Sequence, residues 1–369
     1  MELTFERDPL QKDLVLMHKD KKLLIFNLKE NSFDVLDHTL LPFRLQSSVS
    51  MMMDLRDWIA DRMLPTYRIN ADMVYVAFNE PRSREGQIDL AIRTKAASVL
   101  DTYWIKSESE DVQYEDVNLF NIEWNKDIPK TLVRRDSYIR DNKSPSPELT
   151  LGGSWAKCLI RGQKDSILGP IFGEIKLYKV SCKKDLKDIE SEAVASKILN
   201  SLNIQNVNYS LEELVDIPCS VCKLQTTNDK HWISAGDLLE YSECGTLVDL
   251  GLKYGGDRFI EMLLFDYIIG NNNRRSDNWS FEYNDKNEII GMAPLYDFNA
   301  SFQIKYKDYD VLNLGKRHEE VLIELMRRYN MDGFPKQVKK VICDIEISEK
   351  HRNYILCRIE MLMRKYNGI

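Results

Sequence analysis

Two short polar segments in the second half of the chain carry the side chains best suited to chemistry. Residues 270–278 form one dense polar loop that ends at Asn278. A strand-like run, a turn at 284–287 and a second strand-like run, 289–298, follow, and the second run has Asp297 next to its end. Such a hairpin can return Asp297 to the neighbourhood of Asn278, where amide and carboxylate oxygens would suit Mg²⁺. The plainer alternative is that residues 271–273 form a turn and that Asp297 caps the next element.

A lysine and a glutamate form a second candidate group. Lys179 alternates with Ile175 and Leu177 on one face of a predicted strand. Glu192 lies on the apolar face of the predicted helix 187–202, where an unpaired carboxylate would be costly. Lys179 is the obvious partner, since a strand–helix Lys–Glu pair is how kinases hold the lysine that contacts nucleotide phosphates. An ordinary surface ion pair, with Glu192 near the helix start, is the alternative.

A small glycine-rich turn comes before both groups. Gly152, Gly153 and Ser154 precede a predicted strand that starts at Trp155. Two glycines and a serine there can present backbone N–H groups to a phosphate. A plain turn explains the same residues, and the spacing is not that of a Walker A motif.

The surrounding pattern predicts the elements that must position these groups. Residues 1–139 have the pattern of a mixed α/β unit, with strands at 14–17 and 23–28 and helices at 55–63 and 88–100. A polar, turn-forming linker spans 140–148. Strands dominate from 155 to 180, a helix follows, and a further strand covers 218–224. From 238 the chain is predicted to be mostly helical, apart from the section 271–304. Strands followed by helices is the order of a kinase-type bilobal fold.

Composition restricts the class of protein. The chain has 369 residues and a formal net charge of −7, so it does not have the basic character typical of nucleic-acid binding. Short basic pairs such as Arg274 and Arg275 fit a solvated surface. No apolar run is long enough to span a membrane, and the first residues lack the apolar core of a signal peptide, which together predict a cytoplasmic location.

The cysteines and histidines do not predict a zinc site. The seven cysteines are an odd, scattered set, typical of free thiols in a reducing compartment. Cys219 and Cys222 form a C-x-x-C, but a structural zinc site would need a second ligand pair. The five histidines stand far apart in sequence. Buried packing is therefore the expected role of Cys219 and Cys222.

Taken together, these segments resemble the HipA-like kinase family, in particular its stand-alone bacterial members. Residues 266–279 (DYIIGNNNRRSDNW) resemble the catalytic segment of that family, and residues 294–298 (PLYDF) resemble its metal-binding segment. Residues 177–179 are similar to the strand of the nucleotide lysine, residues 191–196 to the start of the paired helix, and residues 218–222 to the strand that enters the hinge. Weaker similarity around residues 101–106 and 114–120 extends the resemblance to this family over most of the chain.

The resemblance implies an α+β, bilobal, protein-kinase-like fold with an added N-terminal α/β domain and a mostly helical C-terminal lobe. The implied domains are residues 1–139, the linker 140–148, an N-lobe-like region 149–226 and a C-lobe 227–369. The implied cofactors are ATP and Mg²⁺, with a protein hydroxyl as acceptor. An antitoxin-like regulatory partner is also expected, without nucleic-acid or membrane binding by the chain itself.

Residue roles follow from the same resemblance. Lys179 would contact the ATP phosphates and pair with Glu192, while Asn278 and Asp297 would hold Mg²⁺. Lys223, Leu224 and Gln225 would form the hinge beside the adenine. Gly152, Gly153 and Ser154 would form the turn over the phosphates.

One departure from the family pattern concerns catalysis. The catalytic aspartate of the family falls at Asn273, and its following histidine falls at Arg275. An asparagine can orient a hydroxyl but cannot accept its proton near neutral pH. The sequence is therefore compatible with a slow serine/threonine kinase, with a nucleotide-binding pseudokinase that acts through partners, or with an enzyme whose aspartate has been replaced. Transfer of AMP instead of phosphate is a further alternative.

Overall fold

The computed structural model describes residues 12–134, 139, 145–166, 169–303 and 318–368. The chain divides into two compact units, each made of several segments. Unit 1 comprises Met1–Val180, Lys223–Trp232 and Tyr283–Glu288, and unit 2 comprises Ser181–Cys222, Ile233–Glu282 and Ile289–Ile369. The predicted domain limits stay predictions, and most of the linker 140–148 lies outside the described residues.

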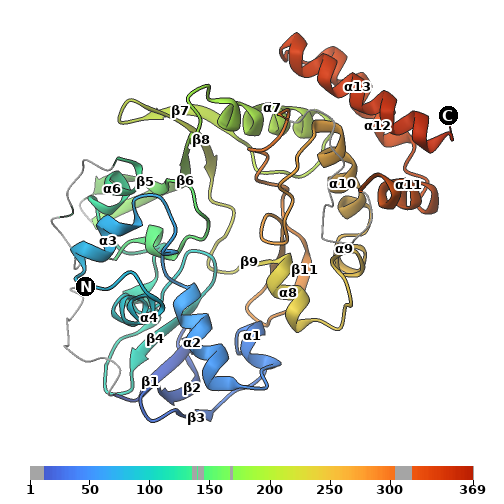
Figure 1. Ribbon diagram of the computed structural model, residues 1–369. Coiled ribbons are helices and arrows are strands. Elements are labelled where there is room, and N and C mark those ends of the chain that lie inside the picture. The colour runs from blue at the N-terminus through green and yellow to red at the C-terminus, as the bar shows by residue number, and fades with distance from the viewer. Residues whose placement is uncertain (1–11, 135–138, 140–144, 167–168, 304–317, 369) are drawn as a thin grey trace. The chain divides into compact units, whose positions relative to one another are not determined.

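Unit 1 is built around an antiparallel sheet with the strand order β3-β2-β1-β4 (Figure 1). Its strands are β1 (Leu14–His18), β2 (Lys21–Asn27), β3 (Ser32–Val35) and β4 (Tyr103–Ser107). Its helices are α1 (Phe43–Gln46), α2 (Met51–Asp61), α3 (Ala71–Ala77), α4 (Arg84–Arg93), α5 (Tyr114–Val117) and α6 (Ile128–Val133). Leu16 and Phe26 of the sheet pack in one core with Leu55 of α2 and Ile88 of α4. The alternation of side chains along β1 and β2 thus buries one sheet face under helices.

The second part of unit 1 carries the glycine-rich turn. A 3₁₀ helix, η2 (Pro147–Thr150), leads into the turn, and the long antiparallel strands β5 (Lys157–Ser166) and β6 (Gly169–Val180) follow. Leu151 and Leu159 pack with Val15 and Trp104 of the first sheet, so the turn is attached to the core of unit 1.

Unit 2 is mostly helical. Its helices are α7 (Lys187–Ser201), α8 (Ala235–Tyr241), α9 (Leu247–Gly255), α10 (Asp257–Ile269), α11 (His318–Arg328), α12 (Gly333–Asp344) and α13 (Glu349–Tyr366). Its strands are β7 (Ser210–Leu214), β8 (Ile217–Lys223), β9 (His231–Ser234), β10 (Ser280–Tyr283) and β11 (Ile289–Met292), of which β8, β9 and β10 each extend into unit 1. The buried helix α10 contacts α9, α11, α12 and α13, and the red helices α12 and α13 lie side by side in Figure 1.

Two predicted elements end earlier than their sequence pattern suggests. The helix predicted at 88–100 is α4, which ends at Arg93 because Thr94 Oγ bonds back to the Leu90 carbonyl and Lys95 takes φ 62°. The last predicted strand, 289–298, ends at Met292 as β11. Pro294 cannot donate to a ladder, and Leu295 instead forms an isolated parallel bridge with Asn206. No helix among the described residues is long and apolar enough to cross a membrane.

Candidate functional site

The polar loop of unit 2 begins at a position that only glycine fills well. Gly270 ends α10 with φ 66°, in the left-handed region. A Cβ placed on Gly270 would lie 2.0 Å from the Tyr354 hydroxyl oxygen of α13. Both constraints favour glycine, because other residues avoid positive φ and a side chain here would collide. The buried apolar stripe of α10 therefore ends in a sharp turn that directs the chain into residues 271–278.

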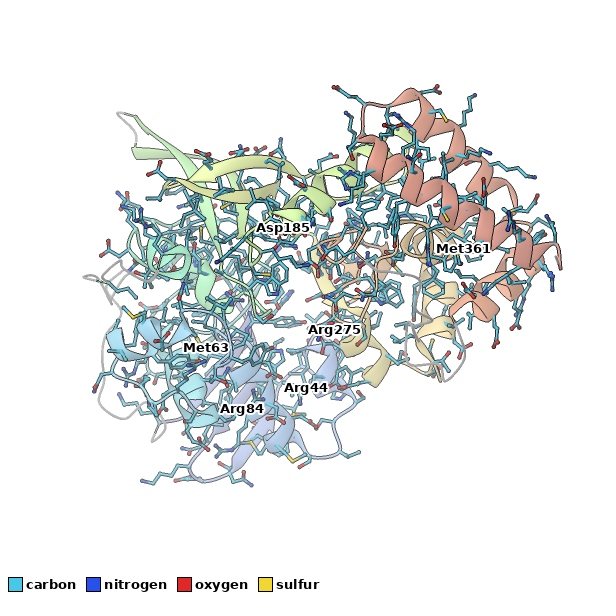
Figure 2. All side chains as sticks on the ribbon, turned by 45° about the horizontal axis from the view of Figure 1, so that its top comes forward. Arg44, Met63, Arg84, Asp185, Arg275 and Met361 are labelled. Atoms are coloured by element: carbon cyan, nitrogen blue, oxygen red, sulfur yellow. The ribbon has the colours of Figure 1, made fainter. Side chains whose placement is uncertain are left out.

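A buried ion pair forms the centre of this loop. Arg274 Nε lies 2.7 Å from Asp266 Oδ2, and both side chains are 0% exposed. Arg274 Nη2 also donates to Asp266 Oδ1 at 3.1 Å, so the contact is bidentate. Burial alone would lower the pKa of Arg274, but the charge of Asp266 raises it. The interpretation of Arg274 as a solvated basic residue is therefore wrong, whereas the side chain of its neighbour Arg275 is 68% exposed. Arg275 is labelled in Figure 2.

Arg274 also brings the two chemically suited segments together. Its Nη1 donates to the Tyr296 carbonyl at 2.6 Å and to the Asn278 carbonyl. One guanidinium nitrogen therefore links the residue before Asp297 to Asn278 itself. The side chain of Asn278 donates from Nδ2 to the Asn273 carbonyl at 2.6 Å, which leaves its Oδ1 as the atom suited to a cation. The hairpin thus returns the chain as its sequence pattern suggests.

Asp297 has a backbone conformation that is uncommon outside glycine. Its φ is 62°, and its N–H lies 3.4 Å from the Tyr209 hydroxyl, which accepts the bond. Asn299 Nδ2 donates to Asp297 Oδ1 at 3.0 Å. Non-glycine residues at positive φ persist where the surroundings over-determine them, and they concentrate at functional sites. A carboxylate oxygen and an amide oxygen are hard donors of the kind that Mg²⁺ prefers.

Asn273 lies inside this loop with its side chain half-buried. Its backbone N–H donates to Asn271 Oδ1 at 3.3 Å, and Asn271 in turn donates to Asp266 Oδ1 at 2.8 Å. Its backbone carbonyl accepts the bond from Asn278. Within the described residues the side-chain amide of Asn273 makes no hydrogen bond. The loop is therefore fixed through its backbone, and the residue at position 273 can change without breaking the network.

In unit 1 the glycine-rich turn is fixed by a residue that the sequence pattern does not reveal. Arg68 is 1% exposed, and its guanidinium donates to the carbonyls of Leu151, Gly152 and Gly153, the last at 2.9 Å. Gly153 has φ 91°. The Ser154 carbonyl accepts a bond from the Ile69 N–H at 3.1 Å. The carbonyls of the turn are thus held on one side by Arg68 and Ile69.

The nucleotide-lysine candidate has a second lysine as its neighbour. Lys179 of β6 pairs directly with Lys157 of β5 in the antiparallel register, so the two side chains share one face. Lys157 Nζ is also close to the turn, because a Cβ built on Gly153 would lie 2.8 Å from it. Two lysines and a glycine turn in one part of unit 1 favour an anionic group there. Sequence spacing alone does not identify Lys157 as the neighbour of Lys179, because the pairing of these two lysines depends on the β5–β6 register.

The predicted hinge residues lie at the start of the second segment of unit 1. Lys223 Nζ forms an exposed ion pair with Glu174. The Leu224 N–H donates to the Ile175 carbonyl at 2.9 Å, and Gln225 Nε2 donates to the Lys223 carbonyl at 2.9 Å. Backbone pairing therefore ties this segment to β6.

Glu192 of α7 is buried, with 1% of the residue exposed, as its apolar face predicts. Its Oε2 accepts a hydrogen bond from the Ser220 hydroxyl of β8. The pairing of Glu192 with Lys179 stays a prediction. Cys219 and Cys222 of β8 form no disulfide and are buried, which agrees with the packing role expected for them.

Comparison with known proteins gives a match at the level of structure. No protein-family model and no curated protein matches the sequence. The HipA chain from the toxin–antitoxin complex of Shewanella oneidensis MR-1 with HipB and operator DNA aligns with a TM-score of 0.54 and 13% identity, covering 96% of this chain and 98% of that one. The Helicobacter pylori proinflammatory kinase CtkA aligns with a TM-score of 0.39 and 15% identity, covering 56% of this chain and 90% of that one. Across nearly its whole length, the chain therefore has the α+β, kinase-like fold of HipA.

Proposed function

We propose that this protein binds Mg-ATP and transfers its γ-phosphoryl group to a serine or threonine hydroxyl of a protein, at a rate limited by Asn273. The observation that supports the proposal best is the link that Arg274 makes between the Asn278 and Tyr296 carbonyls. It holds the backbone at Asn278 and at the residue before Asp297, so one guanidinium joins the segments that carry Asn278 Oδ1 and the Asp297 carboxylate. A fold alone does not establish an activity, so the proposal depends on this local arrangement.

The candidate residues would have separate roles in the proposed chemistry. Asn278 and Asp297 would hold Mg²⁺, which when bound neutralises phosphate charge in phosphoryl transfer. Lys179, with Lys157 beside it on the same strand face, would contact phosphate oxygens, and the turn Gly152–Ser154 would offer backbone N–H groups. Lys223, Leu224 and Gln225 would lie beside the adenine, and Glu192 would position Lys179.

Asn273 sets the expected rate. The side chain at this position can accept or donate a hydrogen bond to the acceptor hydroxyl, but it cannot take up the proton at neutral pH. Loss of a positioned general base typically lowers a rate by about 10²–10⁴-fold. Positioning and electrostatic stabilisation remain, and they provide most of the catalysis of phosphoryl transfer.

The same residue supports a second candidate function. A nucleotide-binding pseudokinase that acts through protein partners needs Asn278 and Asp297 but not an aspartate at position 273. Within the described residues the Asn273 side chain makes no hydrogen bond in the loop network, so the loop is compatible with a residue other than aspartate at position 273. The HipA of the structural match is in complex with HipB and operator DNA. By analogy of fold alone, we propose a protein partner with a regulatory role for this chain too.

Nucleotide binding is the first test. Isothermal titration with ATP, in the presence and absence of Mg²⁺, is compared for the unchanged chain, Asp297→Asn and Asp277→Asn. Asp277 matches Asp297 in charge and lies near the same loop, but its side chain is 58% exposed and pairs with Arg275. We expect Mg²⁺-dependent binding that Asp297→Asn weakens and Asp277→Asn does not. Equal binding by all three proteins would refute the assignment of Asp297.

Activity is the second test. The unchanged chain and Asn273→Asp are incubated with Mg-ATP and a panel of peptide and protein acceptors, and intact masses are followed over time. A phosphate increment that is about 10²–10⁴-fold faster in the variant supports a kinase limited by its missing base. Increments in neither protein, with nucleotide binding intact, would support the pseudokinase. A mass increment the size of AMP would show that the protein transfers AMP and not the γ-phosphoryl group.

A further inference from the structure

Three side chains of types that bind metals come from distant parts of the sequence and meet in unit 1, and none of them belongs to the proposed nucleotide or Mg²⁺ residues. They are His18 at the end of β1, His231 at the start of β9 and Asp285 in the turn between β10 and β11. One ligand atom from each residue lies within 4.8 Å of the other two. The separation of the histidines in the sequence argued against such a site, but the fold removes that objection.

A shared metal would engage all three side chains, whereas a hydrogen bond joins only His231 and Asp285. His231 Nε2 lies 2.8 Å from Asp285 Oδ1, and His18 Nε2 lies 3.7 Å from the same oxygen. The second distance is too long for a hydrogen bond, and the described residues offer no hydrogen-bond partner to the ring of His18. Ligand atoms bound to one tetrahedral zinc lie about 3.4 Å apart, given bonds of about 2.1 Å. The two observed separations bracket that value.

Burial and charge favour binding of a cation here. His18 is 7% exposed and His231 is 1% exposed, so both rings are held in the protein interior. Imidazole nitrogens and a carboxylate oxygen are donor atoms that a divalent d-block cation accepts.

The groups around the cluster orient it. Lys19 Nζ lies 2.5 Å from Asp285 Oδ2, which fixes the carboxylate so that Oδ1 faces the histidines. Asp229 lies 3.1 Å from the same ammonium and offsets its charge. The ring of His18 packs on Tyr103 with centroids 5.0 Å apart, and the ring of His231 packs on Tyr283 at 5.2 Å. Such outer contacts are what hold ligand side chains in place at metal sites.

We propose that His18, His231 and Asp285 form a binding site for a divalent d-block cation, with Zn²⁺ as the best match to two imidazoles and one carboxylate. Three protein ligands leave a fourth position for water. The bound cation would join the β1–β2 turn, the start of β9 and the turn of the β10–β11 hairpin, and so would stabilise unit 1. The proposal does not depend on ATP, Mg²⁺ or kinase activity.

The test uses the full chain, first stripped of metal with a chelator. Zn²⁺ is titrated calorimetrically, and thermal unfolding is recorded with and without Zn²⁺. We expect one Zn²⁺ per chain and a rise in Tm of about 5 °C at a hundredfold excess over Kd. Asp285→Asn and His18→Gln should each weaken binding at least about 10-fold, a common effect of losing one ligand interaction. His38→Ala, which removes an exposed histidine of unit 1, should bind as the unchanged chain does.

Two features keep the result unambiguous. Each variant's Tm without metal reports whether it folds, and Co²⁺ added to the unchanged chain gives an absorption spectrum that distinguishes nitrogen and oxygen ligands from thiolates. Thiolate bands would assign binding to the free cysteines and overturn the proposal. The absence of stoichiometric Zn²⁺ binding, or equal affinity in Asp285→Asn and the unchanged chain, would overturn it as well.

Discussion

Two loops of this molecule are each anchored by a buried arginine, and they differ in what balances its charge. Arg274 holds the loop of Asn278 and has Asp266 as a bidentate partner at 2.7 Å. Arg68 holds the glycine-rich turn through three carbonyls, and within the described residues it forms no salt bridge. The pKa values reflect this, because the charge of Asp266 raises that of Arg274, whereas burial lowers that of Arg68 to about 10.

The contrast shows two ways to fix a loop that has no regular structure. Where the arginine has a carboxylate partner, removing either residue lowers the unfolding free energy strongly, since the remaining charge would be buried and unpaired. Carbonyl partners fix the backbone but compensate the charge only in part. Glu148, a fully buried carboxyl, interacts electrostatically with Arg68, and burial raises the pKa of Glu148 to about 7.

The largest effect is expected at Asp266. Asp266→Asn leaves Arg274 buried without a counter-ion, and breaking such a pair costs about 3–5 kcal/mol of unfolding free energy. Urea denaturation, followed by fluorescence, measures the loss. A change below about 1 kcal/mol would mean that the bonds to the Asn278 and Tyr296 carbonyls, and not the ion pair, fix the loop.

A smaller loss is expected at Arg68. Arg68→Met keeps most of the apolar volume but leaves carbonyls of the glycine-rich turn without donors, which costs about 1–3 kcal/mol. The same denaturation experiment applies. A loss equal to that of Asp266→Asn would remove the distinction between the two anchors.

The pH dependence of stability sharpens the comparison. Glu148 has a folded-state pKa of about 7, above its unfolded value, so the folded protein binds more protons between these values. Its contribution to stability is therefore greatest in acid and declines as the pH rises through about 7. Glu148→Gln should abolish this decline, and the difference between the two proteins should be on the order of 2–3 kcal/mol across the range. Unfolding free energies measured from pH 5 to pH 8 test this, and parallel curves would contradict it.

The smallest effect is expected at the exposed pair beside the buried one. Arg275 lies 2.9 Å from Asp277, but the two side chains are 68% and 58% exposed. Asp277→Asn should change the unfolding free energy by less than about 1 kcal/mol, because exposed ion pairs contribute little. This variant is the matched control for Asp266→Asn. A large loss of unfolding free energy in it would show that the exposure of an ion pair in this loop does not predict its contribution to stability.

Local sequence patterns predict much of this architecture. Alternation predicts β1 and β2, the apolar stripe predicts α10, and the polar loop with its hairpin predicts the approach of Asn278 and Asp297. Residues whose partners are distant in sequence escape such patterns. Arg68 acts on carbonyls more than 80 residues later, and Lys157 meets Lys179 only through strand register. The same limit explains why His18 and His231 look unrelated until the chain is folded.

The division of the chain has a consequence for how the protein is made. Unit 1 begins at the N-terminus but includes Lys223–Trp232 and Tyr283–Glu288. A ribosome delivers residues in order, so the first 180 residues leave it long before the last segment of their own unit exists. His18 is made first, His231 belongs to the second segment, and Asp285 belongs to the last. Unit 1 is therefore completed late in synthesis, together with unit 2, and a gene shortened at residue 180 would encode an unfinished unit.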